Sequence, residues 1–264
     1  MDIREELGQG ELRKWEDLNR DCLSNIFGKA GIEMLIWSLP FVCRNWYAVS
    51  LDPQCWKELD FNRPSRSLFR PYIRLHKIPF RELVKFAVKG LPQRCPMLKS
   101  LILPEYEYDD EEDMRCIPKL IRKWTHLEHL TLACGRDFHD ILSEIRIHCK
   151  KFASLSTSIC ITDEATTAIV TLFPNIKSLN LRDSTLDRDN LVWIISECRE
   201  LELLDVRDCE GFDEDDAEIL EMASHIGTFM AEGSIAPYDD LYDCDYVNND
   251  DYKYEGDDSD YDFL

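Results

Sequence analysis

The chain has 264 residues, 44% of them hydrophobic, enough for one large domain or a small domain beside a larger one. It carries 52 acidic against 31 basic side chains, a formal net charge of −21. An excess of negative charge repels phosphate backbones, so we expect no nucleic-acid ligand.

The N-terminal sequence and the cysteine spacing indicate the cellular compartment of the protein. The opening MDIREELGQG has no apolar stretch, so we expect no secretory signal. No run reaches the roughly 18 apolar residues of a membrane-spanning helix, so we expect no membrane partner. The eleven cysteines form no C-x-x-C pair. That favours a soluble protein of a reducing compartment, the cytoplasm or the nucleus, with mostly buried free thiols.

Apolar spacing predicts three short helices in the first sixty residues. The first covers 15–27 and ends at Gly28 or Gly31, the second covers 32–39, and the third occupies 38–50. Together they carry more bulky apolar side chains than one inner face can accommodate. We therefore infer that another surface, in this chain or in another protein, completes the unit.

Details of the third helix complete this pattern. Ser38 is its expected N-cap, and Pro40 then lies in the first turn, where a missing N–H does little harm. "LDP", residues 51–53, is expected to end the helix.

The segments WEDLNRDCLSNIF and LPFVCRNWYAVSLDPQCWKELDF resemble an F-box over residues 13–61. The family usually has proline where this chain has Asn19, so we expect a weaker start of the first helix and weaker adaptor binding. The resemblance implies docking on a Skp-type adaptor, which links to a cullin and a RING subunit. The implied adaptor-binding residues are Leu18, Leu23, Ile26, Phe27, Pro40, Val42, Cys43, Trp46 and Trp56. The alternative is that these side chains only fill an internal core.

A repeat follows in the middle of the chain. The copies LKSLIL, LEHLTL, FASLST, IKSLNL and LELLDV begin at residues 98, 127, 152, 176 and 201. This is the L-x-x-L-x-L pattern and spacing of leucine-rich repeats, degenerate only in the third copy, where Thr157 replaces the last leucine. Helical spacing between the copies predicts an α/β solenoid of parallel strands and helices, in which each unit buries its leucines against its neighbours.

Side chains that alternate with the buried leucines are expected on the open concave face of the solenoid. This face is the predicted target-binding surface. Its residues are Ser100, Ile102, His129, Thr131, Ser154, Ser156, Ser178, Asn180, Arg182, Asp205 and Arg207.

The remaining segments complete the predicted organisation. Residues 95–233 hold the repeats and a C-terminal cap, with Ala217, Leu220, Ile226, Phe229 and Met230 expected on a helix. Residues 62–94 form a linker or an incomplete repeat with a helix around 80–87; their basic side chains line a solvated face or bind an acidic partner. Residues 237–264 read as a disordered acidic tail that serves solubility or an interaction.

The sequence contains little that indicates an enzyme or a metal site. His126, His129, Cys134 and His139 lie close in sequence, but the first two flank a repeat strand, and we predict no metal site. No nucleophile or nucleotide-binding motif is present, so we predict no enzyme and no cofactor. Cys209 occupies the Asn/Cys position of a repeat, where we expect a structural role.

The order of F-box, leucine-rich repeats and acidic tail resembles the plant F-box/leucine-rich-repeat family. The resemblance implies a non-catalytic substrate-recognition subunit of an SCF-type ubiquitin ligase: the F-box binds the adaptor, and the repeats recruit an unknown target protein. The alternative is a leucine-rich-repeat scaffold or ligand-binding protein without a ubiquitin role.

Overall fold

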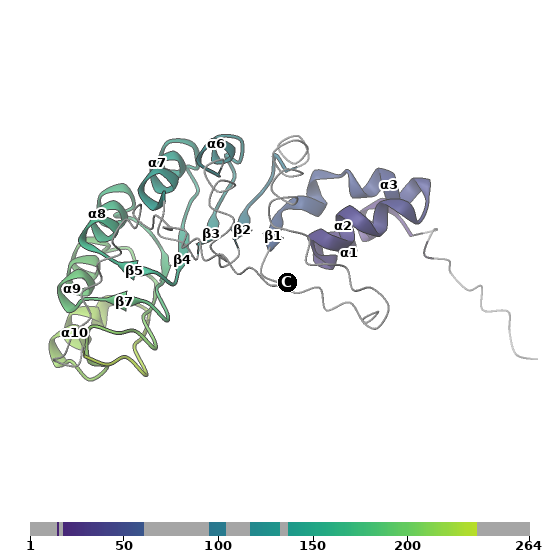
Figure 1. Ribbon diagram of the computed structural model, residues 1–264. Helices are drawn as coiled ribbons and strands as arrows, with labels where there is room; N and C mark the ends of the chain where they lie inside the picture. The colour runs from purple at the N-terminus through teal and green to yellow at the C-terminus, as the bar shows by residue number, and fades with distance from the viewer. Residues whose placement is uncertain (1–14, 16–17, 61–94, 104–116, 133–136, 237–264) are drawn as a thin grey trace, which may run out of the picture.

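A computed structural model describes residues 15, 18–60, 95–103, 117–132 and 137–236. A curved row of strands joins two regions: a group of short helices at the N-terminal end and a stack of strand–helix repeats at the other (Figure 1). The predicted helix around 80–87, the acidic tail and Cys134 lie outside the described residues. The predicted domain boundaries near residues 61 and 94 stay predictions.

Among the described residues, seven parallel strands form the main sheet, in chain order. They are β1 (Glu58–Asp60), β2 (Ser100–Ile102), β3 (His129–Leu132), β4 (Ser154–Thr157), β6 (Ser178–Asn180), β8 (Leu203–Asp205) and β9 (Thr228–Met230). All five predicted repeat strands are present. Their register aligns one inward-facing residue per strand: the buried Leu59, Leu101, Leu130, Leu155, Leu179 and Leu204, and the partly buried Phe229.

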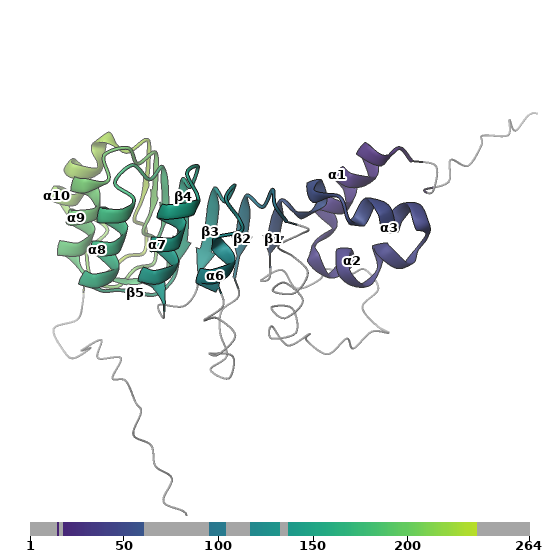
Figure 2. The same cartoon turned by 90° about the horizontal axis from the view of Figure 1, so that it is seen from above.

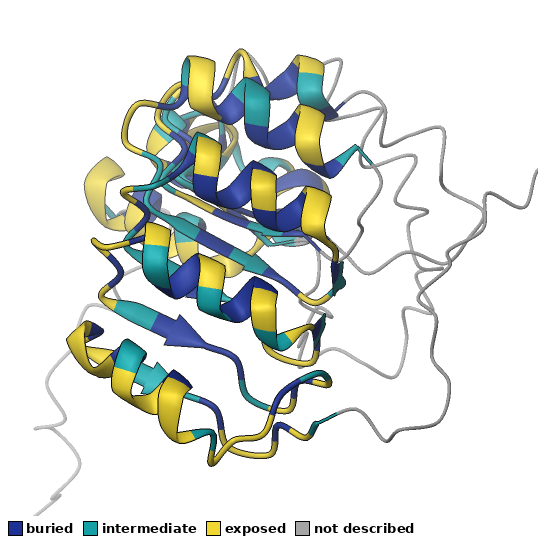
Figure 3. Cartoon of the chain, turned by 90° about the vertical axis from the view of Figure 1, so that its left-hand side faces the viewer, coloured by how far each residue is buried: buried dark blue, intermediate teal, exposed yellow. Residues whose placement is uncertain are grey.

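Helices cover one face of this sheet (Figure 1). They are α6 (Ile117–Ile121), α7 (Phe138–His148), α8 (Asp163–Leu172), α9 (Arg188–Glu197) and α10 (Ala217–Met222). Their buried sides face the strands, and their exposed sides form the outer surface (Figure 3). A second, two-stranded sheet pairs β5 (Cys160–Ile161) with β7 (Thr185–Leu186). The alternation of strand and helix confirms the predicted α/β fold.

The first predicted helix begins later than expected. α1 spans Arg20–Ala30, and the Asn19 side chain caps it by accepting a hydrogen bond from the Cys22 backbone N–H at 2.8 Å. The expectation that Asn19 weakens the helix start is therefore wrong, because an asparagine N-cap satisfies an otherwise unpaired N–H. The helix ends at Gly31, as predicted, where φ is 88°.

The predicted third helix is two helices. After α2 (Ile32–Trp37), a 3₁₀ turn, η2 (Leu39–Phe41), precedes α3 (Arg44–Ser50). Ser38 makes no side-chain capping bond; instead the Cys43 sulfur accepts from the Trp46 N–H at 3.5 Å and begins α3. Another 3₁₀ turn, η3 (Pro53–Trp56), leads into β1.

One hydrophobic core runs through both regions. It begins with Leu23 in α1, continues through Trp56 and Leu59, and reaches Ala231 after β9. Trp56 is fully buried, and its indole N–H donates to the Ser50 carbonyl at 2.8 Å. The N-terminal helices are thus fused to the first repeat strand.

The predicted C-terminal cap helix is shorter than expected. α10 ends at Met222, a 3₁₀ turn follows (η5, Ala223–His225), and Phe229 and Met230 lie in strand β9. Phe229 takes the position that a leucine holds in the other repeats, aligned with Leu204. The apolar residues after 225 therefore add a strand to the sheet.

The last three repeats share a loop of fixed geometry. Asp183, Asp208 and Gly233, each 25 residues apart, adopt left-handed backbone conformations with φ of 58°, 56° and 82°. In each loop the side chain of the following residue donates a hydrogen bond to a backbone carbonyl of the preceding repeat. Ser184 donates to the Thr157 carbonyl, Cys209 to the Leu181 carbonyl and Ser234 to the Val206 carbonyl. Cys209, buried within this ladder, has the predicted structural role.

Candidate functional site

Large apolar side chains gather on the exterior of the N-terminal helices. The exposed fractions are 75% for Phe41, 53% for Val42, 52% for both Trp37 and Tyr47, and 43% for Ile26. We call these five residues the docking face. They lie on α1, the end of α2, η2 and α3, a compact group of helices at one end of the molecule (Figure 2). So many exposed large apolar side chains on so small a group of helices are typical of a protein-interaction site.

The docking face rests on a rigid support. The Phe27 and Trp46 rings meet edge to face, with centroids 5.1 Å apart. The 3₁₀ turn η2 presents Phe41 outward, and the Cys43 cap fixes the start of α3 directly after Val42. Leu23, Phe27 and Val49 are buried under these helices, and the five side chains of the docking face lie outside.

The predicted adaptor-binding residues divide by exposure. Ile26 and Val42 are exposed, and Leu18, Pro40, Cys43 and Trp46 are partly exposed. Leu23, Phe27 and Trp56 are buried in the core beneath the docking face, and their assignment to adaptor binding stays a prediction. The predicted set omits Trp37, Phe41 and Tyr47, whose signal was only the surplus of bulky apolar residues in this short segment.

The second candidate surface is the sheet face opposite the helices, which no described helix covers (Figure 1). The register aligns two rows of side chains across the strands. One row holds Ser100, His129, Ser154, Ser178 and Leu203, and the other holds Ile102, Thr131, Ser156, Asn180 and Asp205. Five of these ten side chains carry a small hydroxyl group, which can both donate and accept a hydrogen bond.

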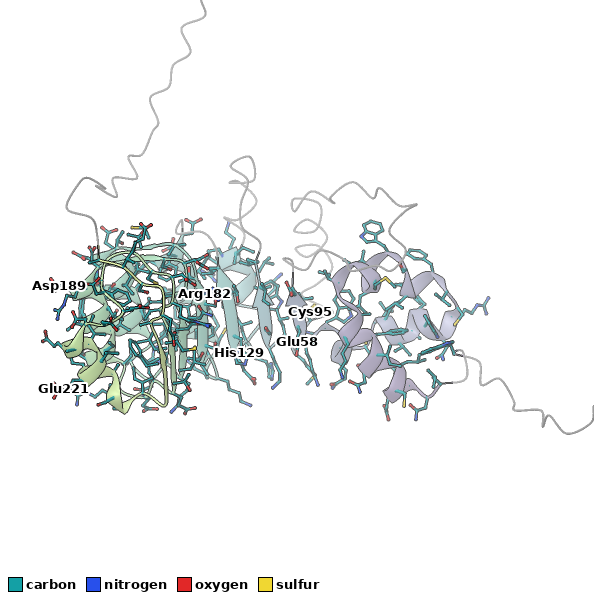
Figure 4. The ribbon with its side chains drawn as sticks, turned by 90° about the horizontal axis from the view of Figure 1, so that it is seen from below. Glu58, Cys95, His129, Arg182, Asp189 and Glu221 are labelled. Carbon is teal, nitrogen blue, oxygen red and sulfur yellow. The ribbon has the colours of Figure 1, made fainter. Side chains whose placement is uncertain are left out.

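Charged residues close the C-terminal end of this face. Arg182 pairs with Asp208 at 2.6 Å, and Arg207 donates two hydrogen bonds to Asp205, at 2.9 and 2.8 Å. These bonds lower the pKa of the Asp205 carboxyl. Asp205 is buried, and its carboxylate orients Arg207. Its role in target contact stays a prediction. Figure 4 shows His129 and Arg182 along the strand side of the molecule.

Metal and small-molecule sites find no support in the described part of the chain. There, no three His, Cys, Asp or Glu side chains come close enough to hold a metal ion. A hollow of about 550 Å³ between α1 and β1 is lined by charged and polar side chains, among them Asp21, Lys29, Lys57 and Glu58. Among the described helices, none has the length and apolar character to cross a membrane.

Comparisons with known proteins agree with this architecture. An Arabidopsis thaliana F-box/LRR-repeat protein is 27% identical over 77% of this chain and 75% of its own length. The Arabidopsis F-box protein FBW2 is 26% identical over 75% of this chain and 69% of its own. A further Arabidopsis F-box/LRR-repeat protein is 25% identical over 75% of this chain, which spans about half (49%) of that relative.

These relatives support placing the chain in the plant F-box/leucine-rich-repeat family, as its motifs indicated. No family model matches the chain. A solved internalin structure from Listeria monocytogenes shows 13% identity and a TM-score of 0.33 over 55% of this chain and 44% of its own, a likeness too small to bear on function.

Proposed function

We propose that this protein is the substrate-recognition subunit of an SCF-type ubiquitin ligase, with no catalytic role of its own. The docking face binds a Skp-type adaptor, and through it a cullin and a RING subunit. The concave strand face binds the target protein. The observation that carries the proposal is the exposure of Phe41, Val42 and Trp37 above a filled interior, in a segment that resembles an F-box.

The mechanism is proximity. One continuous core joins the N-terminal helices to the repeats, so the two binding surfaces keep a fixed spacing. A target held on the strands is thereby brought near ubiquitin carried by the RING-bound enzyme, which raises the effective concentration of its lysines. We place this activity in the cytoplasm or the nucleus, and imaging of a fluorescent fusion tests that placement.

The adaptor contact can be tested with two matched substitutions. Val42→Lys places a charge in the docking face, and Ile147→Lys places one at a comparably exposed (57%) apolar position on α7, far along the chain. Loss of a central interface contact costs about 2 kcal/mol or more, roughly a 30-fold weaker Kd. We expect that loss for Val42→Lys and no change for Ile147→Lys, measured by calorimetry against a Skp-type adaptor.

The competing function is a leucine-rich-repeat scaffold without a ubiquitin role. Folded wild-type protein that shows no adaptor binding would favour it, as would equal behaviour of the two lysine variants. Circular dichroism spectra of both variants establish that they are folded. The target surface is tested separately by Ser156→Arg, which fills the sheet face without touching the docking face.

A further inference from the structure

Two arginines of the concave strand face lie at equivalent positions of neighbouring repeats but are held in different ways. Arg182 follows β6 (Figure 4), and Arg207 follows β8, 25 residues later. Arg182 pairs with Asp208, the left-handed residue of the next loop, at 2.6 Å. The equivalent residue for Arg207 is Gly233, which has no side chain to accept a bond. Arg207 therefore bonds to its own strand and donates through Nε and Nη2 to Asp205.

This bond leaves Arg207 with fixed, unused donors at the surface. A guanidinium group carries five N–H donors, of which Asp205 takes two. The Arg207 side chain is 35% exposed and that of Asp205 only 5%, so the bonded edge of the guanidinium faces the protein and the other donors face outward. The buried carboxylate thus holds a planar donor group in one orientation.

Asn180 adds a second fixed donor beside Arg207. Its side-chain oxygen accepts a hydrogen bond from the Arg182 backbone N–H at 3.0 Å, which fixes the amide with its NH₂ group turned away from that bond. Among the residues that the structure describes, none accepts from this NH₂ group. Asn180 aligns with Asp205 on the adjacent strand, about 4.8 Å away, so its amide lies close to the guanidinium of Arg207. We call Asn180, Arg182 and Arg207 the donor cluster.

The donor cluster has no excess of positive charge that would attract an anion. Asp205 and Asp208 balance its two arginines. Asp183 lies 3.6 Å from Arg182, and the carbonyl of Glu232 accepts from the Asp208 backbone N–H, so two further carboxylates border the cluster. Four acids against two arginines repel the carboxylates and phosphates of a partner. The outward groups of the cluster are N–H donors, which bind no ammonium or guanidinium group either. A neutral acceptor oxygen is the group that fits.

We propose that the donor cluster binds backbone carbonyl oxygens of an uncharged segment of the target protein. This inference rests on the proposed function, because it names the chemistry that the concave strand face recognises. Ser156 aligns with Asn180 on the neighbouring strand, and its hydroxyl can accept from a backbone N–H of the same segment. Because the arginines are already neutralised, the contact depends on short-range hydrogen bonds and responds little to salt.

A random peptide library displayed on phage is the probe, selected on the full-length chain. The selected peptides should contain fewer Asp and Glu residues than the unselected library, since the carboxylates around the cluster repel them. Synthetic copies of these peptides give the Kd by fluorescence anisotropy. It should change less than about twofold between about 0.05 and 0.5 M salt.

Two asparagine-to-aspartate substitutions in one repeat separate the cluster from a general effect of charge. Asn180→Asp keeps the oxygen that accepts from Arg182 but replaces the NH₂ donor by an acceptor, so the peptides should bind at least about tenfold more weakly. Asn175→Asp adds the same charge in the exposed turn before β6 and should leave the Kd unchanged. Urea unfolding establishes that both variants keep the fold.

The outcomes distinguish this inference from the proposed function. Peptides that lose binding with Ser156→Arg but ignore Asn180→Asp would overturn the role of the donor cluster and keep the concave strand face as a binding surface. Selection of acid-rich peptides, or a Kd that weakens more than about tenfold with salt, would overturn the neutral acceptor. Peptides that ignore both substitutions, or no enrichment over a surface without protein, would overturn the inference, while adaptor binding is measured independently at the docking face.

Discussion

The repeats and the N-terminal helices differ in how completely they bury their large apolar side chains. In the repeats, each strand contributes leucines to a stack that neighbouring strands seal, so the row from Leu101 to Leu204 is almost fully buried. The N-terminal helices bury Leu23, Phe27 and Trp56 but leave five large apolar residues outside. Large apolar side chains are thus buried between neighbouring strands in the repeats but partly exposed at the surface of the N-terminal helices.

The difference follows from geometry. A repeat array provides a new inner surface with every unit, so the number of apolar residues it can bury grows with its length. Three short helices provide one small interior, which a few aromatic rings fill. Apolar residues beyond that number stay outside, where a second protein can cover them.

The largest effect is expected from truncating a central side chain of the core, in either of the two regions. Trp56→Ala removes a buried ring and its bond to Ser50, and such changes cost about 3–5 kcal/mol. Leu179→Ala in β6 costs about 2–5 kcal/mol for the same reason. Urea unfolding gives both values, and amide hydrogen exchange shows where each chain opens first.

The exchange patterns should separate the two regions. Trp56→Ala should speed exchange mainly in α1 and α3, and Leu179→Ala mainly in β4, β6 and β8, because local opening follows the damaged packing. Uniform acceleration in both variants would contradict the comparison and show that helices and repeats unfold as one unit.

The second prediction concerns the cap of α1. Asn19→Ala removes the acceptor for the Cys22 N–H and should lower the free energy of unfolding by about 1 kcal/mol. Asn19→Asp keeps an acceptor at the same place and should preserve stability, which urea unfolding measures. If the alanine variant matches the wild type, the cap contributes nothing and the original expectation about Asn19 returns.

Sequence patterns predicted the repeats far better than the N-terminal surface. The period of the leucine motif fixes which side chains face inward, and even the degenerate Thr157 is buried as its position requires. Apolar spacing predicted the first helix, but it did not separate the buried Leu23 and Phe27 from the exposed Ile26. Periodicity identifies an apolar face but not how much of it the interior can hold, since that depends on neighbouring helices distant in sequence.

The C-terminal misassignment has a related cause. Phe229 and Met230 continue an apolar spacing that fits a helix, but pairing with β8 makes them a strand. Tertiary pairing overrides a short local pattern. No leucine motif marks β9, because an aromatic residue fills the leucine position.

The third prediction uses the ion pair at the end of the concave face. Arg207 holds the pKa of Asp205 below its usual 3.8. A carboxyl group whose pKa is lower in the folded state stabilises the fold above its unfolded pKa and loses that contribution as pH falls through the folded value. Asp205→Asn should therefore cost about 1 kcal/mol at neutral pH, and the difference from wild type should shrink well below pH 3.8.

Urea unfolding at several pH values measures this effect, and Asp183→Asn is the matched control. Asp183 is exposed and lies 3.6 Å from Arg182, so its loss should change little. A cost for Asp205→Asn that is equally large in strong acid would assign its role to packing and not to charge.

The smallest effect is expected within the ladder of the last repeats. Cys209 donates to the Leu181 carbonyl at 3.1 Å, and serines make the equivalent bond one repeat before and one after. Cys209→Ser should therefore change the free energy of unfolding by less than about 0.5 kcal/mol, whereas Cys209→Ala, which leaves that carbonyl without its donor, should cost about 1 kcal/mol. Burial also raises the pKa of the Cys209 thiol to about 11, so alkylation of the folded protein should modify the exposed Cys22 and spare Cys209. Equal destabilisation by serine and alanine would show that the position selects the volume of sulfur and not a hydrogen-bond donor, and that the three loops are alike in backbone only.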